Sequence, residues 1–268
     1  RIMTPYDMGR ISAFLILHRK LEDRSDKRGM RPDEKELGAL LREATVDELR
    51  DLEDLMSGQG FVLVQLTSFD IEGIGPGSRV YLAARRADMP SCLVDGSHIP
   101  EGMGLPTQPT AAKIWFTQIW LLHLDLLYTQ LDRSPSERGR WINASFTREM
   151  LQDAVHAHIN DHVRKLNAVQ LGDSEVYDVL CAEKGTEISK RVKRFLDLMC
   201  RGGLLEERGE GVYRQTLLSA VEMKENFDRS LAPLMLTSES TGQRTTIGQV
   251  ASALLTTTQE ALSEGGEQ

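Results

Sequence analysis

Cysteine is scarce in this chain of 268 residues, and its three copies lie far apart. Cys92, Cys181 and Cys200 form no Cys-x-x-Cys pair, and their number is odd. This distribution argues against a disulfide framework and offers no ligand spacing for a zinc site. We therefore expect a protein of a reducing compartment, the cytoplasm.

Sequence motifs of enzymes are also missing. The glycine-rich segment at residues 73–77 lacks the Lys-Ser/Thr pair of a phosphate-binding loop and the GxGxxG spacing of a dinucleotide site. His158 and His162 would share a helix face, but Ile159 stands where the HExxH zinc motif needs glutamate. We therefore predict no catalytic residue, no metal ion and no cofactor. An enzyme whose site has no local motif is the alternative.

The chain has fewer basic residues than acidic ones, 32 Lys and Arg against 40 Asp and Glu. The formal net charge is −8 and the isoelectric point is about 5.4. Proteins that bind nucleic acid in general draw their affinity from clustered Lys and Arg, which this balance does not favour. The charge favours a protein partner, or DNA contact through a local basic patch within a larger assembly.

The most hydrophobic stretch covers residues 110–131, and its apolar positions run nearly all the way round a helix. Lys113, His123 and Asp125 interrupt it, and charge at bilayer depth is costly, so a membrane span is disfavoured. A buried core helix or a dimerisation helix is the prediction. The candidate dimer or partner interface consists of its large side chains, Trp115, Phe116, Trp120 and Leu124.

The N-terminal part of the chain predicts three helices followed by a β-hairpin. Helices are expected at residues 11–21, 32–43 and 45–56, and strands at residues 61–67 and 79–84. Pro32 suits a first helical turn, and Thr45 with Glu48 fits a capping box. Residues 20–31 are expected to form a charged connection. This order of elements is that of a winged helix.

The C-terminal half repeats this order without repeating residue identities. Helices are expected from 147 to about 166, at 174–182, at 187–201 and at 217–236, with a hairpin at 204–214. Thr147, Asp173 and Thr186 are the predicted caps. The predicted fold is therefore mainly α with short β-hairpins, as tandem winged-helix units joined by a buried hydrophobic helix. A winged helix at about residues 173–215 is the central element of this prediction.

Composition divides the chain into four predicted segments. Residues 1–88 form an N-terminal winged-helix-like unit, and residues 89–109 form a connector rich in proline and glycine. Residues 110–236 hold the central helix and the C-terminal winged-helix unit. Residues 237–268 are rich in Ser, Thr, Gly and Glu, and we expect a flexible tail.

The third helices of the two units differ in charge. Residues 46–56 carry five acidic residues against one arginine, so phosphate would be repelled and a protein partner is expected. The helix at 187–201 instead carries basic residues on the side opposite its apolar stripe. In a helix-turn-helix protein, this is the helix that would enter the major groove. The candidate DNA-binding residues there and in the hairpin are Lys190, Arg191, Lys193, Arg194, Arg208 and Arg214. A solvated face of a core helix is the alternative interpretation.

These features together resemble the tandem winged-helix "kite" subunits of bacterial SMC complexes. The likeness is to the MukE-like subunits of condensin-type systems and their Wadjet anti-plasmid relatives. It rests on residues 186–214 and, more weakly, on residues 45–84, within a span of about residues 10–236. It implies a non-catalytic, nucleoid-associated subunit that forms a homodimer, binds the kleisin of the SMC ATPase and helps to clamp DNA, in chromosome maintenance or plasmid defence.

A DNA-binding transcription regulator or a replication initiator with paired winged helices is the main alternative. Such a protein would be expected to carry two cationic recognition helices, whereas the helix at residues 46–56 is acidic.

Overall fold

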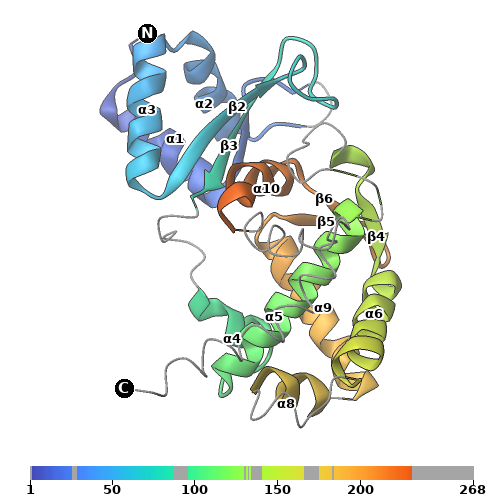
Figure 1. The fold of residues 1–268 in the computed structure, drawn as a ribbon. Helices are drawn as coiled ribbons and strands as arrows, with labels where there is room; N and C mark the ends of the chain where they lie inside the picture. Colours follow the sequence, from blue (N-terminus) through green and yellow to red (C-terminus); the bar gives the residue numbers. More distant parts are fainter. Residues whose placement is uncertain are drawn as a thin grey trace. The chain divides into compact units, whose positions relative to one another are not determined.

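The computed structural model describes residues 2–25, 29–86, 96–129, 131, 133, 141–165, 175–182 and 184–230 (Figure 1). The described chain is mainly helical. It holds two three-stranded antiparallel sheets, with strand orders β1-β3-β2 and β4-β6-β5. The predicted fold class is therefore confirmed at the level of a mainly helical protein with short antiparallel hairpins.

The chain divides into two compact units. Unit 1 comprises Arg1–Asp95, Pro135–Asn143 and Thr216–Ser230, and unit 2 comprises Gly96–Ser134, Ala144–Gln215 and Leu231–Gln268. Unit 2 is therefore inserted into the sequence of unit 1. Of the predicted connector, residues 89–95 lie outside the described residues, and so does the whole predicted tail at 237–268.

Unit 1 begins with three helices and three strands. They are α1 (Pro5–His18), β1 (Lys20–Glu22), α2 (Pro32–Glu43), α3 (Val46–Gly58), β2 (Phe61–Thr67) and β3 (Arg79–Arg85). The predicted bounds of α2 and β2 are confirmed. The capping box of α3 is also confirmed, because the Thr45 hydroxyl accepts from the Glu48 amide while the Glu48 carboxylate accepts from the Thr45 amide.

Two predictions at the N-terminus were wrong. Helix α1 begins well before Ile11, because Thr4 and Asp7 form a capping box ahead of the apolar residues. The expected charged connection contains strand β1, in which Leu21 is fully buried and pairs with Tyr81 of β3. A strand of three residues is too short to show a periodic pattern, so only its pairing partner defines it.

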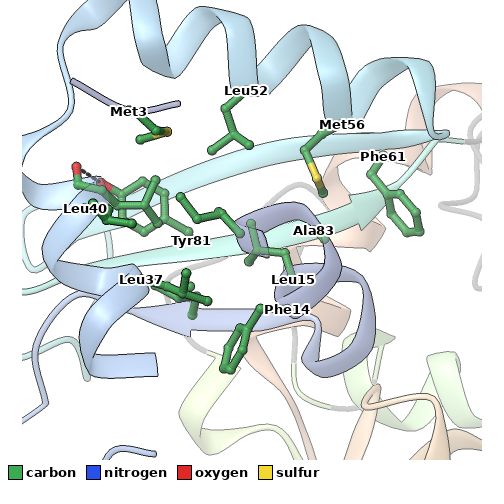
Figure 2. Packing of buried hydrophobic residues seen from close by; sticks show 13 residues of the cluster. Met3, Phe14, Leu15, Leu37, Leu40, Leu52, Met56, Phe61, Tyr81 and Ala83 are labelled. Carbon is green, nitrogen blue, oxygen red and sulfur yellow. Dashed lines mark hydrogen bonds between the residues drawn. The ribbon is translucent and has the colours of Figure 1, made fainter. Parts of the chain in front are cut away.

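The core of unit 1 lies between the helices and one face of the sheet (Figure 2). Phe14 and Leu15 reach it from α1, and Leu52 and Met56 reach it from α3. Tyr81 extends from the central strand into this cluster. Its hydroxyl donates to the Leu41 carbonyl at 3.5 Å, so the polar end of this buried ring has a partner.

Strand β3 is buried on both faces. Tyr81 and Ala83 face the helical core, and the alternation of a strand places Val80, Leu82 and Ala84 on the opposite face, where they are also buried. Helix α10 (Leu217–Ser230) packs against β3 (Figure 1). The continuous apolar run of β3 is therefore explained by α10, which returns to unit 1 after the whole of unit 2.

A buried carboxylate fixes α10 to β3. Glu222 is 7% exposed, and it accepts from the backbone amide of Arg85 at 3.0 Å and from the Arg85 guanidinium at 2.7 Å. The guanidinium of Arg19 donates to the same carboxylate. Asn226, one turn later, donates to the Arg85 carbonyl at 2.9 Å. Two arginines thus share one carboxylate at the C-terminal end of β3.

We predict that Glu222→Ala destabilises the protein by about 3 kcal/mol, because removal of one partner leaves buried positive charge uncompensated. Glu225→Ala is the matched control, since Glu225 lies on the same helix and is exposed. Urea unfolding followed by circular dichroism measures both variants. Equal unfolding midpoints for the two would show that α10 does not depend on the ion pair.

Unit 2 is built around a long hydrophobic helix. Its elements are η1 (Gly96–His98), α4 (Ile99–Gly102), α5 (Pro109–Leu124), η2 (Asp125–Thr129), β4 (Ser145–Thr147), α6 (Arg148–Ala157), η4 (His158–Val163), α8 (Glu175–Ala182), α9 (Gly185–Arg201), β5 (Leu205–Gly209) and β6 (Val212–Gln215). The short η3 (Trp141–Asn143) belongs to unit 1. The segments η2 and η4 continue α5 and α6 as π-helices.

One of the predicted caps is confirmed and one is wrong. The Thr147 hydroxyl accepts from the Met150 amide at 3.1 Å and caps α6. Helix α9 begins at Gly185, two residues earlier than expected, after Lys184 and with no side-chain cap, so Thr186 lies inside the helix. Asp173 lies outside the described residues.

The two sheets share one topology. In each unit a three-residue strand pairs with the last strand of a hairpin, and that last strand pairs with the strand before it. In each unit this three-residue strand follows a helix and precedes the helices that lead to the hairpin. The two units therefore share their strand order and pairing, but unit 1 has two helices between its first two strands, whereas the described part of unit 2 has α6, α8 and α9 between β4 and β5.

Candidate functional site

Helix α9 is strongly amphipathic. Its buried stripe packs against α5 and α6 and consists of Ile188, Val192, Phe195, Leu196 and Met199. Lys190, Lys193 and Arg194 lie on the exposed side, as the spacing predicts. Lys190 is paired with Glu187 at 2.6 Å, whereas Lys193 and Arg194 form no ion pair with any described residue. The exposed face therefore keeps a local surplus of positive charge.

Arg191 has a different environment from its neighbours. It is 9% exposed, and its guanidinium donates to the Met103 carbonyl at 3.0 Å. The segment around α4 lies against this side of α9, since a Cβ at Gly102 would meet the Leu198 side chain at 2.5 Å. Arg191 therefore holds α4 on α9 and does not belong to the candidate DNA surface, which corrects the prediction from spacing.

The hairpin of unit 2 is not a cationic element. Arg208 donates to Glu206 at 2.9 Å, and Arg214 donates to the same carboxylate at 2.6 Å. Glu207 and Glu210 are exposed beside them. The two hairpin arginines are thus outnumbered by three carboxylates, whereas on the exposed side of α9 only Lys190 has an acidic partner, so the candidate DNA surface reduces to Lys190, Lys193 and Arg194.

Helix α3 presents the opposite charge. Asp47, Asp51, Glu53 and Asp54 are all exposed, and the only opposing charge on this helix is Arg50, which lies 3.9 Å from Asp47. Within the described part of the chain, Asp51, Glu53 and Asp54 form no ion pair. Like charges three and four residues apart on a helix are mildly destabilising, so this surface is suited to a cationic partner rather than to phosphate.

The predicted interface on α5 lies largely inside unit 2. Trp115 and Leu124 are 1% and 2% exposed, and Phe116 and Trp120 are partly buried. Helix α5 contacts α4, α6, α8 and α9, and the ring of Phe116 lies 5.4 Å from that of Phe195. These side chains form the core of the unit and leave little surface for a partner. In the described part of the chain, no helix has the length and apolarity that crossing a bilayer requires.

The surplus of exposed apolar groups lies instead on unit 1. Tyr6 and Leu17 of α1 are both 73% exposed, and Ile2 just before this helix is 83% exposed. Phe69, in the turn that directly follows β2, is 99% exposed. The sequence pattern did not reveal the α1 surface, because a helix that starts at Ile11 would leave Tyr6 outside it and count Leu17 as core.

Two histidines of unit 2 are buried as neutral rings. Burial lowers the pKa of His123 from 6.5 to about 4, although its Nδ1 lies 2.6 Å from the Trp120 carbonyl. Burial, and then the neighbouring His162 ring 5.7 Å away, lowers the pKa of His158 to about 4. Among the described residues no three His, Cys, Asp or Glu side chains gather into a group that could hold a metal ion.

We predict that unit 2 loses stability as the pH falls from 6.5 towards 4. Both folded pKa values are depressed, so in this window the unfolded chain binds more protons than the folded one, and stability is fully present only above it. The shift at His123 corresponds to about 3 kcal/mol at the acid end. His123→Phe should flatten the dependence of the melting temperature on pH, and His98→Phe, at an exposed position, should leave it unchanged. An unaltered profile in His123→Phe would contradict the assignment.

The chain was compared with protein-family models, with curated proteins and with solved structures, and none of them matches it.

Proposed function

We propose that this chain is a non-catalytic scaffold subunit that binds other proteins through unit 1 and contacts DNA weakly through α9 of unit 2. One observation carries the proposal. The two units share their strand topology, but the helix that precedes each hairpin is acidic in unit 1 and basic on its exposed side in unit 2.

The shared topology supports a tandem winged-helix arrangement. In helix-turn-helix proteins the last helix before the hairpin is the one that enters the major groove, and α3 and α9 occupy this position. A scaffold that uses the same fold twice for different partners would carry different charge on these two helices. That is the pattern that the exposed residues of α3 and α9 have.

DNA contact by α9 would be weak and independent of sequence. Three exposed cations, Lys190, Lys193 and Arg194, provide few phosphate contacts, and Lys190 is already paired with Glu187. The net charge of −8 opposes approach to DNA. On this proposal α9 touches DNA when a partner holds the chain against it.

The proposed setting is a bacterial SMC complex of the condensin type, with the chain in the place of a MukE-like kite subunit, including those of Wadjet systems. Its partners would be the kleisin, the SMC ATPase and a second copy of the chain, in the cytoplasm and close to the nucleoid. Chromosome maintenance and plasmid defence are both compatible with this role. The acidic α3 surface supports this proposal over a regulator with two DNA-reading helices.

We predict that Lys190→Glu combined with Lys193→Glu weakens binding of the chain to a duplex at low salt by at least about tenfold, and that it lowers the salt slope by roughly two. Lys113→Glu combined with Lys224→Glu is the matched control, because it changes net charge equally at exposed positions of other helices. Fluorescence anisotropy at several salt concentrations measures both. Equal losses in the two variants would assign the effect to net charge and remove α9 from the proposal.

The partner proposal is tested by affinity purification of the tagged chain from its native host at native expression level. We expect a large coiled-coil ATPase and a kleisin to co-purify in defined ratio. Replacement of Asp51, Glu53 and Asp54 by Lys should remove them, because these carboxylates are exposed and without ion-pair partners in the described chain. Purification without any ATPase, together with tight binding to one short operator, would favour the regulator.

A further inference from the structure

The solvent face of α1 carries no charge. The exposed positions Tyr6, Gly9, Ala13 and Leu17 recur at helical spacing along one side of α1, and Ile2 just before the helix is exposed as well. The nearest charged group is Arg10 at the border of this stripe. Its guanidinium is held by Glu36 of α2 at 2.7 Å and 2.9 Å, and it lies 5.9 Å from the centre of the Tyr6 ring. We call these five residues the α1 stripe.

Such a face is unusual on a chain in which 27% of the residues are charged. Exposed helix faces normally carry Lys, Arg, Asp or Glu, as α3 does in the same unit. Ile2, Tyr6 and Leu17 are exposed by 83%, 73% and 73%, so no described residue covers their apolar surface. An exposed apolar surface of this kind marks a site of contact with another molecule.

The two small residues in the middle of the stripe, Gly9 and Ala13, are exposed and do not pack against other described residues of the chain. Among the described residues, a Cβ at Gly9 would meet nothing within 4 Å, so no described neighbour requires glycine there. Glycine inside a helix costs about 1 kcal/mol relative to alanine. Close approach of a second backbone from outside would explain both Gly9 and Ala13, since small residues allow two helices to pack at short distance.

We propose that the α1 stripe is a homodimer interface in which α1 packs antiparallel against α1 of a second copy. The stripe matches itself in this direction. A twofold axis at the level of residues 11–12 of α1 places Gly9 near Ala13 of the other copy, and Tyr6 near Leu17 of the other copy. Within α1, the two large side chains of the stripe then face each other and so do the two small ones, while Ile2 lies beyond these paired positions. This is the self-complementarity that a twofold interface requires.

The charges at the two ends of the stripe favour the same direction. At its N-terminal end, Glu48 of α3 accepts from the Met3 amide, and Asp47 is exposed beside it. At its C-terminal end, the Arg31 guanidinium lies 2.7 Å from the ring of His18. Antiparallel pairing brings the acidic end of one copy to the basic end of the other, whereas parallel pairing would join like charges. The helix dipoles also favour the antiparallel arrangement.

The inference deepens the homodimer part of the proposed function, and it holds or fails independently of DNA contact. One helix face provides less than the roughly 800 Å² that each partner contributes to a standard interface. We therefore expect reversible association, with a dissociation constant in the range of about 1–100 µM.

Sedimentation equilibrium of the full chain, from about 1 µM to about 1 mM, brackets this range. We expect the mass to rise from monomer to dimer. Gly9→Leu and Leu17→Glu should each raise the dissociation constant by at least about tenfold. Gly9→Leu places its side chain in open space, so its melting temperature should not fall. Phe69→Glu is the matched control, because it makes the same kind of change at a site that is 99% exposed and off the stripe.

The register is tested by mixing two variants that do not dimerise alone. Tyr6→Lys and Leu17→Glu should form a heterodimer when mixed, because antiparallel pairing then has one Lys–Glu pair and one native Leu–Tyr pair. A parallel interface, or one elsewhere on the chain, would give no such rescue.

Three results overturn the proposal. The first is a monomer at all concentrations, and the second is a dimer that persists in both stripe variants. The third is a dimer that forms only after residues 231–268 are removed, because that segment would then be the occupant of the stripe.

Discussion

The structure of unit 1 depends on the burial of a charged trio, Glu222 with Arg19 and Arg85. Strand β3 has apolar side chains on both faces, and the helices α1 to α3 cover only one of them. Helix α10 packs against β3, and two arginines, Arg19 and Arg85, donate to its buried Glu222 where the helix meets the end of this central strand. Glu222 offsets the charge of both arginines, which lowers the cost of burying them beside the second face of the sheet.

Elements with local signals could be predicted from the sequence. The proline of α2, the capping box of α3 and the apolar run of β2 are properties of neighbouring residues, and the bounds that they indicate are found in the structure. Strand β1 could not be predicted, because its three residues are defined by a partner some sixty positions away. The packing of α10 in unit 1 could not be predicted for the same reason, since no local pattern shows which unit a helix joins.

The candidate surfaces could likewise be predicted only where local sequence determines them. The helical period of α9 correctly placed Lys190 and Lys193 on the exposed side. It could not show that Arg191 donates to the carbonyl of Met103, which lies 88 positions away in the sequence. Nor could it show that Glu206 accepts from both hairpin arginines. Whether a charge is available to a partner depends on the side chains that surround it, and those are brought together only by the fold.

The insertion of unit 2 into unit 1 has a consequence for the order in which the chain folds during synthesis. The ribosome releases α1 to β3 first, but the helix that covers the second face of β3 is made only after β6. Until then the apolar face of Val80, Leu82 and Ala84 lacks its cover, while all the residues of unit 2 that precede α10 have already been made. Unit 2 can therefore complete its folding before unit 1, although its synthesis begins later. A nascent chain that ends before α10 exposes an apolar surface of the kind that chaperones recognise.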